Sequence, residues 1–130
     1  MIPFLPKEKD GYILDIGCGQ GSFIGDCVKN HNRTNVKGVD ISKEVVIYCQ
    51  NEGFPAEHIN NLDDFMMNSS KPLLATKYDA VLDTVGGDIL AQSLKQIKYD
   101  GVATCCGLTA SYELNTNVYP FILRGVRLIG

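Results

Sequence analysis

The chain has 130 residues, of which 45 % are hydrophobic, and its 12 basic and 15 acidic side chains give a net charge of −3 at pH 7. This length fits a single domain, residues 1–130, with a buried core. An acidic balance without a cluster of lysine and arginine argues against a nucleic-acid partner, because such partners are held mainly by basic side chains.

The sequence predicts neither a secretory signal nor a membrane span. No apolar run approaches the roughly 18 residues that a span needs, and the first residues lack the charged start and long apolar centre of a signal peptide. Five cysteines without a Cys-x-x-Cys pair argue against a disulfide framework and a thiolate zinc site. We therefore expect a cytoplasmic protein that binds no metal and contacts no membrane.

The chain is organised around a short apolar strand that ends in a glycine-rich turn. Residues 12–16 form a run typical of a parallel strand that is buried on both faces. Three glycines at alternate positions follow and allow a sharp turn and a close approach to a ligand: Gly17, Gly19 and Gly21. A helix predicted over residues 22–30 points its first N–H groups at the same place. The pattern predicts a ligand site, and the alternative is a glycine turn that serves only packing.

A second predicted strand, over residues 35–40, ends in an acid. Asp40 follows Gly21 by 19 residues, and an acid at this place can accept hydrogen bonds from the hydroxyl groups of a ribose. The same negative charge repels a 2′-phosphate, so we do not expect NADP as the cofactor. The alternative is that Asp40 only caps the helix predicted from Ser42 onward.

These two segments resemble the first motifs of class I S-adenosylmethionine-dependent methyltransferases. Leu14-Asp15-Ile16-Gly17-Cys18-Gly19-Gln20-Gly21 matches the Asp-x-Gly-x-Gly-x-Gly pattern, and Gly38-Val39-Asp40-Ile41-Ser42 continues the match. The resemblance covers residues 1–67 and makes S-adenosylmethionine the candidate cofactor. It implies that Asp15 and the three glycines surround this cofactor, that Asp40 holds its ribose and that Ile41 packs on its adenine. We interpret Cys18 as a small spacer beside the ligand and not as a nucleophile.

The same resemblance implies an acid or amide that contacts the adenine amino group. A third strand is predicted over residues 56–60 and a short helix over residues 62–67. Asn61 lies at the junction between them and is the best-aligned candidate, with Asp63 second. Helix capping explains either residue equally well. A polar connector follows over residues 68–77.

The remaining residues predict further strands and helices. Strands are expected over 78–83, 102–108 and 126–129, with a helix over 88–97 and a short helix that has Pro120 near its start. Asp83 ends the first of these strands. It is a candidate partner for the amino group of the methionine part of the cofactor, and the alternative is that it caps its own turn.

Four segments of this second part carry a different resemblance: Lys71-Pro72-Leu73, Asp83-Thr84-Val85-Gly86-Gly87, Cys106-Gly107-Leu108 and Pro120-Phe121-Ile122-Leu123-Arg124-Gly125-Val126. Residues 71–130 are similar to the C-terminal half of the NADP-binding domain in the quinone oxidoreductase and acryloyl-CoA reductase branch of the medium-chain dehydrogenases. The resemblance implies that the turns at Thr84 and Gly107 face the nicotinamide end of a bound cofactor in that family.

Both families build the same kind of core. We therefore predict an α/β, Rossmann-like three-layer αβα sandwich, with a mostly parallel sheet of about six strands in the order 3-2-1-4-5-6. Residues 1–67 and 78–130 would be its halves, joined at residues 68–77. We interpret the chain as a chimera of engineered origin, and the alternative is a divergent methyltransferase whose second half matches by chance.

Three functions stay open. The first is a hybrid domain that binds S-adenosylmethionine without efficient catalysis, and the second is a small methyltransferase of unknown acceptor. The third is a fold-recombination protein that binds no ligand, or binds NAD(P) only weakly. Oxidoreductase activity is not expected, because the phosphate loop of that family is replaced and its catalytic domain is not recognisable. The expected partner is thus a small nucleoside cofactor, and an exposed sheet edge offers a route to homo-oligomers.

Overall fold

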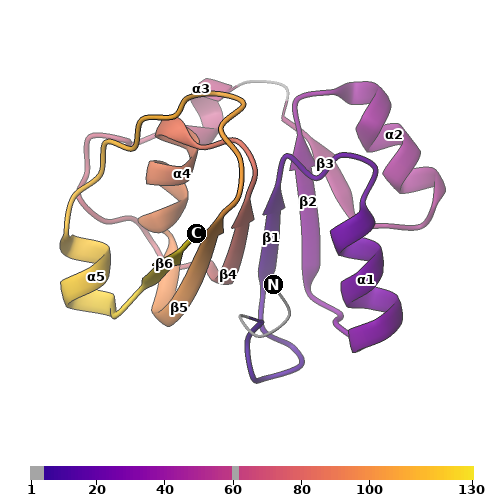
Figure 1. The fold of residues 1–130 in the computed structure, drawn as a ribbon, viewed down its shortest axis with the longest axis horizontal. Helices are drawn as coiled ribbons and strands as arrows, with labels where there is room; N and C mark the ends of the chain where they lie inside the picture. The colour runs from indigo at the N-terminus through magenta and orange to yellow at the C-terminus, as the bar shows by residue number, and fades with distance from the viewer. Residues whose placement is uncertain (1–4, 60–61) are drawn as a thin grey trace.

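The computed structural model describes residues 5–59 and 62–130, in which strands and helices alternate (Figure 1). The strands are β1 (Ile13–Ile16), β2 (Val36–Asp40), β3 (Ala56–His58), β4 (Tyr78–Asp83), β5 (Ile97–Cys105) and β6 (Arg127–Ile129). The helices are α1 (Ser22–His31), α2 (Lys43–Asn51), α3 (Leu62–Phe65), α4 (Gly87–Leu94) and α5 (Tyr119–Arg124). Within the described residues, no helix has the length and apolar character needed to cross a bilayer.

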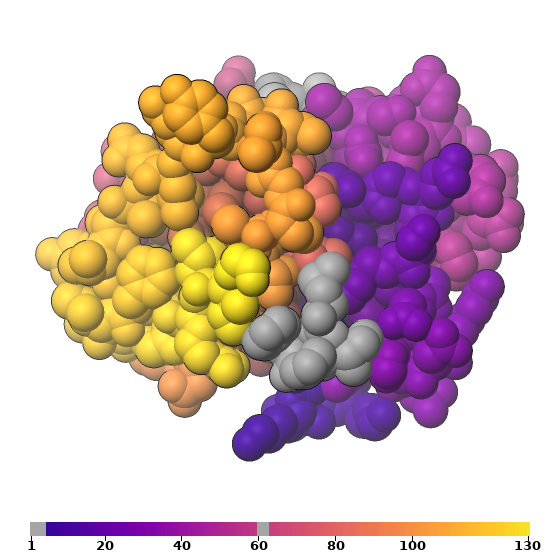
Figure 2. Space-filling view, viewed as in Figure 1, coloured from indigo at the N-terminus to yellow at the C-terminus, as the bar shows by residue number. Residues whose placement is uncertain are grey.

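The strands form one parallel sheet in the order β3-β2-β1-β4-β5-β6. This order confirms the predicted fold class. Ile16 at the end of β1 lies opposite Val39 of β2 on one side and opposite Asp83 of β4 on the other. The sheet is therefore continuous across residues 68–77, and Figure 2 shows the first part, in indigo to magenta, packed beside the second part, in orange to yellow.

Two apolar clusters hold the helices on the sheet. Ile13 and Leu14 point to opposite faces, because side chains alternate along a strand, and each is only 1 % exposed. Leu14 belongs to a cluster with Leu94 of α4, and Ile13 belongs to a cluster with Ile24 of α1. Helix α1 of the first part and helix α4 of the second part therefore cover opposite faces of the shared sheet.

Helix α4 is shorter than the sequence predicts. The apolar spacing predicts a helix through Ile97, but α4 ends at Leu94 and Ile97 begins β5, opposite Tyr78. The N–H groups of Lys95 and Gln96 bond to carbonyls three residues earlier, which closes the helix. Ile97 is buried from a strand instead of from a helix. One apolar residue at a boundary satisfies both periodicities, so spacing alone could not place it.

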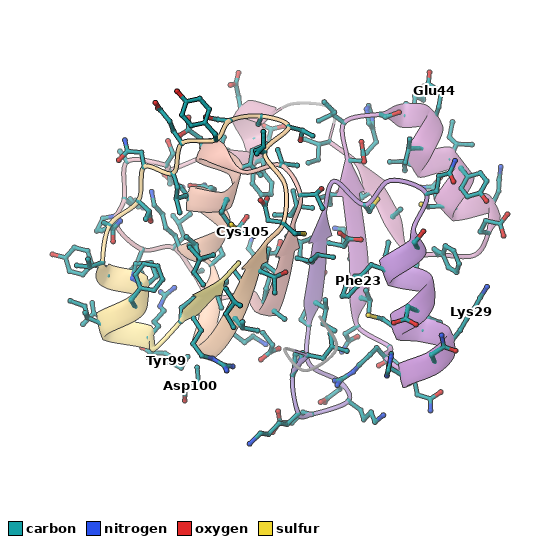
Figure 3. All side chains as sticks on the ribbon, in the orientation of Figure 1. Phe23, Lys29, Glu44, Tyr99, Asp100 and Cys105 are labelled. Atoms are coloured by element: carbon teal, nitrogen blue, oxygen red, sulfur yellow. The ribbon has the colours of Figure 1, made fainter. Side chains whose placement is uncertain are left out.

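The turn predicted at residues 99–101 is an irregularity inside β5. Tyr78 pairs with Ile97 and Ala80 pairs with Val102, so a step of two residues on β4 matches a step of five on β5. Asp100 lies within this step with φ at 61°, a left-handed conformation that aspartate tolerates better than most residues. Figure 3 shows Asp100 near the start of β5 and Cys105 farther along the strand.

Three side chains hold the connector over residues 68–77 and the residues just before it. The ammonium group of Lys95, after α4, donates to the backbone carbonyl of Ser69. The amide of Gln92 donates to the backbone carbonyls of Phe65 and Met67, at 3.1 and 3.0 Å. The guanidinium group of Arg124 donates to the carbonyls of Leu74 and Lys95, both at 2.7 Å. Arg124 therefore ties the connector to the start of β5.

We expect Arg124→Met to lower the free energy of unfolding by about 2 kcal/mol, because two partly buried carbonyls lose a charged donor. Urea denaturation measures the change. The matched control is Arg127→Met, at an exposed arginine of β6, which should stay within about 0.5 kcal/mol of the parent. Equal unfolding free energies for the two variants would show that the hydrogen bonds of Arg124 to Leu74 and Lys95 do not stabilise the fold.

Asp15 is a carboxyl group inside the sheet. It lies on β1 between Gly38 of β2 and Leu82 of β4 and is 2 % exposed. Burial, together with the nearby charge of Asp40, raises the pKa of Asp15 to about 7. Gly38 has no side chain where Ile24 and Cys18 pack, since a Cβ there would lie 2.7 Å from the Cβ of Cys18. Near neutral pH the folded chain thus holds much of Asp15 in its protonated form.

We expect the stability of the parent protein to fall between about pH 4 and pH 7, because the unfolded chain ionises Asp15 there while the folded chain keeps the proton. Asp15→Asn removes this dependence. The free energy of unfolding of the variant, compared with that of the parent, should rise by up to about 4 kcal/mol between pH 4 and pH 8, because one pKa unit corresponds to about 1.4 kcal/mol. Urea unfolding of both proteins across this range measures the gain, and parallel pH profiles would show that Asp15 is not the responsible group.

Candidate functional site

A cleft of about 350 Å³ opens at the carboxyl ends of β1, β2 and β4. In a parallel sheet, ligands bind at this edge where the strand order reverses, and the volume falls in the range of roughly 300–1,000 Å³ that small-molecule sites occupy. The cleft is lined by both parts of the chain: Ile16, Gly17, Val39, Asp40, Ile41, Ile59, Thr84, Val85, Ile89, Thr109 and Ala110. Both parts contribute to the lining because β1 of the first part pairs with β4 of the second part.

The glycine turn is anchored to the end of β2. The N–H groups of Gly17 and Cys18 both donate to the carbonyl of Val39, at 2.9 and 3.1 Å. Gly17, Gly19 and Gly21 have φ values of 76°, 54° and 84°, which other residues adopt only with strain. The turn therefore needs glycine for its backbone conformation at each of the three positions.

The surroundings of the three glycines differ. A Cβ on Gly17 would lie 2.4 Å from the hydroxyl oxygen of Thr84, and a Cβ on Gly21 would lie 2.9 Å from the ring of Phe54. Nothing lies within 4 Å of a Cβ on Gly19. Packing thus explains the lack of a side chain at Gly17 and Gly21, and Gly19 is the position where the turn is open.

Asp40 is fixed at the rim of the cleft. One carboxylate oxygen accepts the N–H of Gly19 at 3.1 Å, and the other accepts the N–H of Ser42 at 2.9 Å. The N-cap of α2 is Ser42, whose hydroxyl oxygen accepts from Val45. Asp40 therefore joins the turn to the start of α2 without being the cap itself. Ile41 beside it is 65 % exposed and lines the cleft.

Of the residues predicted to surround the cofactor, Gly17, Asp40 and Ile41 line the cleft, whereas Asp15, Cys18, Gly19 and Gly21 do not. Asp15 is buried in the sheet, as described above. Cys18 is 7 % exposed, and burial, with the charge of Asp15, raises the pKa of its thiol to about 12. A thiol with this pKa stays neutral near pH 7 and is a poor nucleophile.

Asp83 is fully buried at the end of β4. One of its carboxylate oxygens accepts the N–H of Gly86 at 2.7 Å, so the side chain caps the turn before α4. Burial raises the pKa of Asp83, although hydrogen bonds from the backbone of Gly86 and Val85 act in the opposite direction. Asn61 lies outside the described residues, and Asp63 is exposed on α3.

The reductase resemblance implies that the turn at Thr84 faces a cofactor, but no sequence pattern singled out Thr109 and Ala110 in the same wall of the cleft. Thr84 and Val85 follow β4, and Thr109 and Ala110 lie in the loop after β5. The useful signal was their position just past the carboxyl end of a strand, where loops carry ligand contacts. Ile59 follows β3 in the same way.

Proteins similar to this chain include oxidoreductases that are much longer. The "Probable acrylyl-CoA reductase AcuI" of Escherichia coli is 46 % identical over 124 residues, which is 95 % of this chain and 37 % of that protein. The chain thus spans little more than a third of the length of this relative.

Two solved structures of this group hold a nucleotide. The protein yhfP of Bacillus subtilis, with NAD bound, is 32 % identical with a TM-score of 0.75, over 97 % of this chain and 38 % of that one. YHDH of Escherichia coli K-12, with NADPH bound, is 30 % identical with a TM-score of 0.76, over 94 % of this chain and 37 % of that one.

The expectation that NADP is unlikely as the cofactor is wrong, because a structure 30 % identical over 94 % of this chain holds NADPH. The expectation treated Asp40 as a bare charge. In the structure, its two oxygens each accept a backbone N–H, and hydrogen bonds of this kind offset part of the repulsion that the carboxylate exerts on a neighbouring anion.

A family model described as "Putative methyltransferase" matches residues 9–86, more than half of the chain. The match begins before β1, includes the glycine turn and Asp40, and ends in the turn after β4. The reductase relatives match nearly the whole chain, the later strands included, so the chain combines features of both groups. By the extent of this match, the chain belongs to the methyltransferase family that the model describes.

Proposed function

We propose that the cleft binds the adenosine part of a nucleoside cofactor. The observation that carries this proposal is the position of Asp40, held by the N–H groups of Gly19 and Ser42 at the end of β2. A carboxylate oxygen that accepts one hydrogen bond keeps a further lone pair. The hydroxyl groups of a ribose can donate to these lone pairs beside the open position at Gly19.

The neighbouring residues suit a purine ring. Ile41, Val39 and Ile59 form an apolar wall on the same side of the cleft as Asp40. Packing of an aromatic base on such a wall removes apolar surface from water. The remainder of the cofactor then extends past Gly17 toward Thr84, on the side supplied by the second part of the chain.

Two cofactors share this adenosine chemistry. S-adenosylmethionine is favoured by the methyltransferase family match over residues 9–86. NAD or NADPH is favoured by the nucleotides bound in the similar structures. The glycine turn and Asp40 lie within the methyltransferase match and also within the reductase matches, which cover 95 % and 97 % of this chain. Both cofactors are therefore compared in the test.

The proposal is one of binding without efficient turnover by these 130 residues alone. The relatives' reductase activity belongs to proteins of which the chain spans 37 to 38 %. Engineered origin is our interpretation of why the two sets of features meet in one domain, and it does not affect the binding site.

Calorimetric titration of the parent with S-adenosylhomocysteine, NADH, NADPH and adenosine tests the proposal. We expect adenosine and at least one of the three larger ligands to bind. Binding of S-adenosylhomocysteine alone among the larger ligands would favour the methyl donor, and binding of NADH or NADPH alone would favour the dinucleotide. If none binds at millimolar concentration, the proposal is wrong.

Asp40→Asn should weaken every ligand that binds the parent by at least about tenfold, because hydrogen bonds to a charged acceptor contribute roughly 1.5–3 kcal/mol. The matched control is Glu52→Gln, at the exposed C-terminal end of α2, which should bind like the parent. Circular dichroism checks that both variants fold. Unchanged affinity in Asp40→Asn would mean that the ribose does not contact this carboxylate.

A further inference from the structure

The wall of the cleft supplied by the second part of the chain contains the hydroxyl group of Thr84, whose proton is already used in hydrogen bonds within the protein. Thr84 is the first residue after β4 and lines the cleft. Its hydroxyl lies 2.9 Å from the carbonyl oxygen of Ile16 and 3.2 Å from that of Gly17, and it donates to them. A hydroxyl has one proton and two acceptor lone pairs. The proton of Thr84 is therefore used within the protein, and only its lone pairs are left for a ligand.

The hydroxyl is held in this orientation by its neighbours. It fills the space beside Gly17, where a Cβ would come within 2.4 Å of the hydroxyl oxygen. The loop after β5 packs on the backbone of the same residue, because a Cβ on Gly107 would lie 2.1 Å from the carbonyl oxygen of Thr84. A β-branched side chain has few rotamers, so Thr84 cannot easily turn to donate to a ligand.

The other polar side chains of the cleft, like Thr84, have no proton available to donate to a ligand. Thr109 donates its hydroxyl proton to the carbonyl of Thr84 at 3.3 Å, and Asp40 is a hydrogen-bond acceptor at the opposite end. Among the described side chains that line the cleft, these three are the polar ones. Each can accept a hydrogen bond from a ligand in this arrangement, and none has a proton left to give.

We propose that Thr84 determines specificity by accepting a hydrogen bond from an N–H or O–H group at the non-adenosine end of the cofactor. This inference rests on the proposed adenosine site, which places the other end of the ligand at Thr84. Two sources fit the chemistry: the ammonium group of an amino-acid tail, as in S-adenosylmethionine, and the carboxamide of a nicotinamide ring. A group with acceptors only, such as an ester or ketone, leaves the lone pairs of Thr84 unpaired, which is costly in a dry site.

Pairs of ligands that differ in this donor provide the test. S-adenosylhomocysteine is compared with its analogue that lacks the α-amino group, and NADH is compared with its 3-acetylpyridine analogue, in which the carboxamide is replaced by a ketone. We expect the parent to prefer the donor-bearing member of one pair by about tenfold, the effect of a single hydrogen bond worth about 1.4 kcal/mol. The pair that shows the preference identifies the source of the donor.

Thr84→Val should reduce this preference to within twofold and leave the affinity for adenosine within twofold of the parent. Thr84→Ser keeps the hydroxyl and should keep the preference. Thr34→Val, at an exposed threonine before β2, is the matched control and should behave like the parent. If Thr84→Val does not fold, Thr84→Ala removes the same hydroxyl without adding a methyl group beside Gly17.

The outcomes separate the two proposals. A parent that binds adenosine but shows no preference in either pair, or a preference that survives in the variants without the hydroxyl, overturns the role of Thr84 and leaves the adenosine site intact. A parent that does not bind adenosine overturns the proposed function and, with it, this inference.

Discussion

The structure depends on the parallel pairing of β1 with β4. The two strands are separated by more than 60 residues, yet Ile16 lies opposite Asp83 at their carboxyl ends. This register brings the glycine turn after β1 next to the turn after β4, so that Gly17 meets Thr84. The cleft exists because helices α1 and α4 leave the sheet on opposite faces at this point, as doubly wound sheets do where the strand order reverses.

The pairing has an electrostatic consequence. It encloses Asp15 between two strands and raises the pKa of this acid to about 7. An aspartate that pays a desolvation cost in the core lowers stability at neutral pH. Asp40, one strand away, avoids this cost because it lies at the rim and accepts two backbone N–H groups. Two acids of the same motif thus have different roles, set by depth in the sheet.

Residues from both parts of the chain line the cleft and contact one another. Asp40, Ile41 and Gly17 come from the part that resembles methyltransferases, and Thr84 and Thr109 come from the part that resembles reductases. The hydroxyl of Thr84 bonds to the turn of the other part. A ligand that spans the cleft would therefore contact both parts.

Local patterns in the sequence were enough to predict most of the strands, the glycine turn and the acid after β2, because each depends on residues close together in the chain. The parallel order of the sheet was predicted from the core that the two resembled families share. The end of α4 at Leu94 was missed, since Ile97 fits a helix and a strand equally well. Only the tertiary structure could decide between the two roles open to Asp83, and show that Gly21 packs on Phe54 and that the hydroxyl of Thr84 donates to the carbonyl of Gly17. These roles depend on which strands become neighbours and on the depth of each side chain, and neither is a property of a short segment.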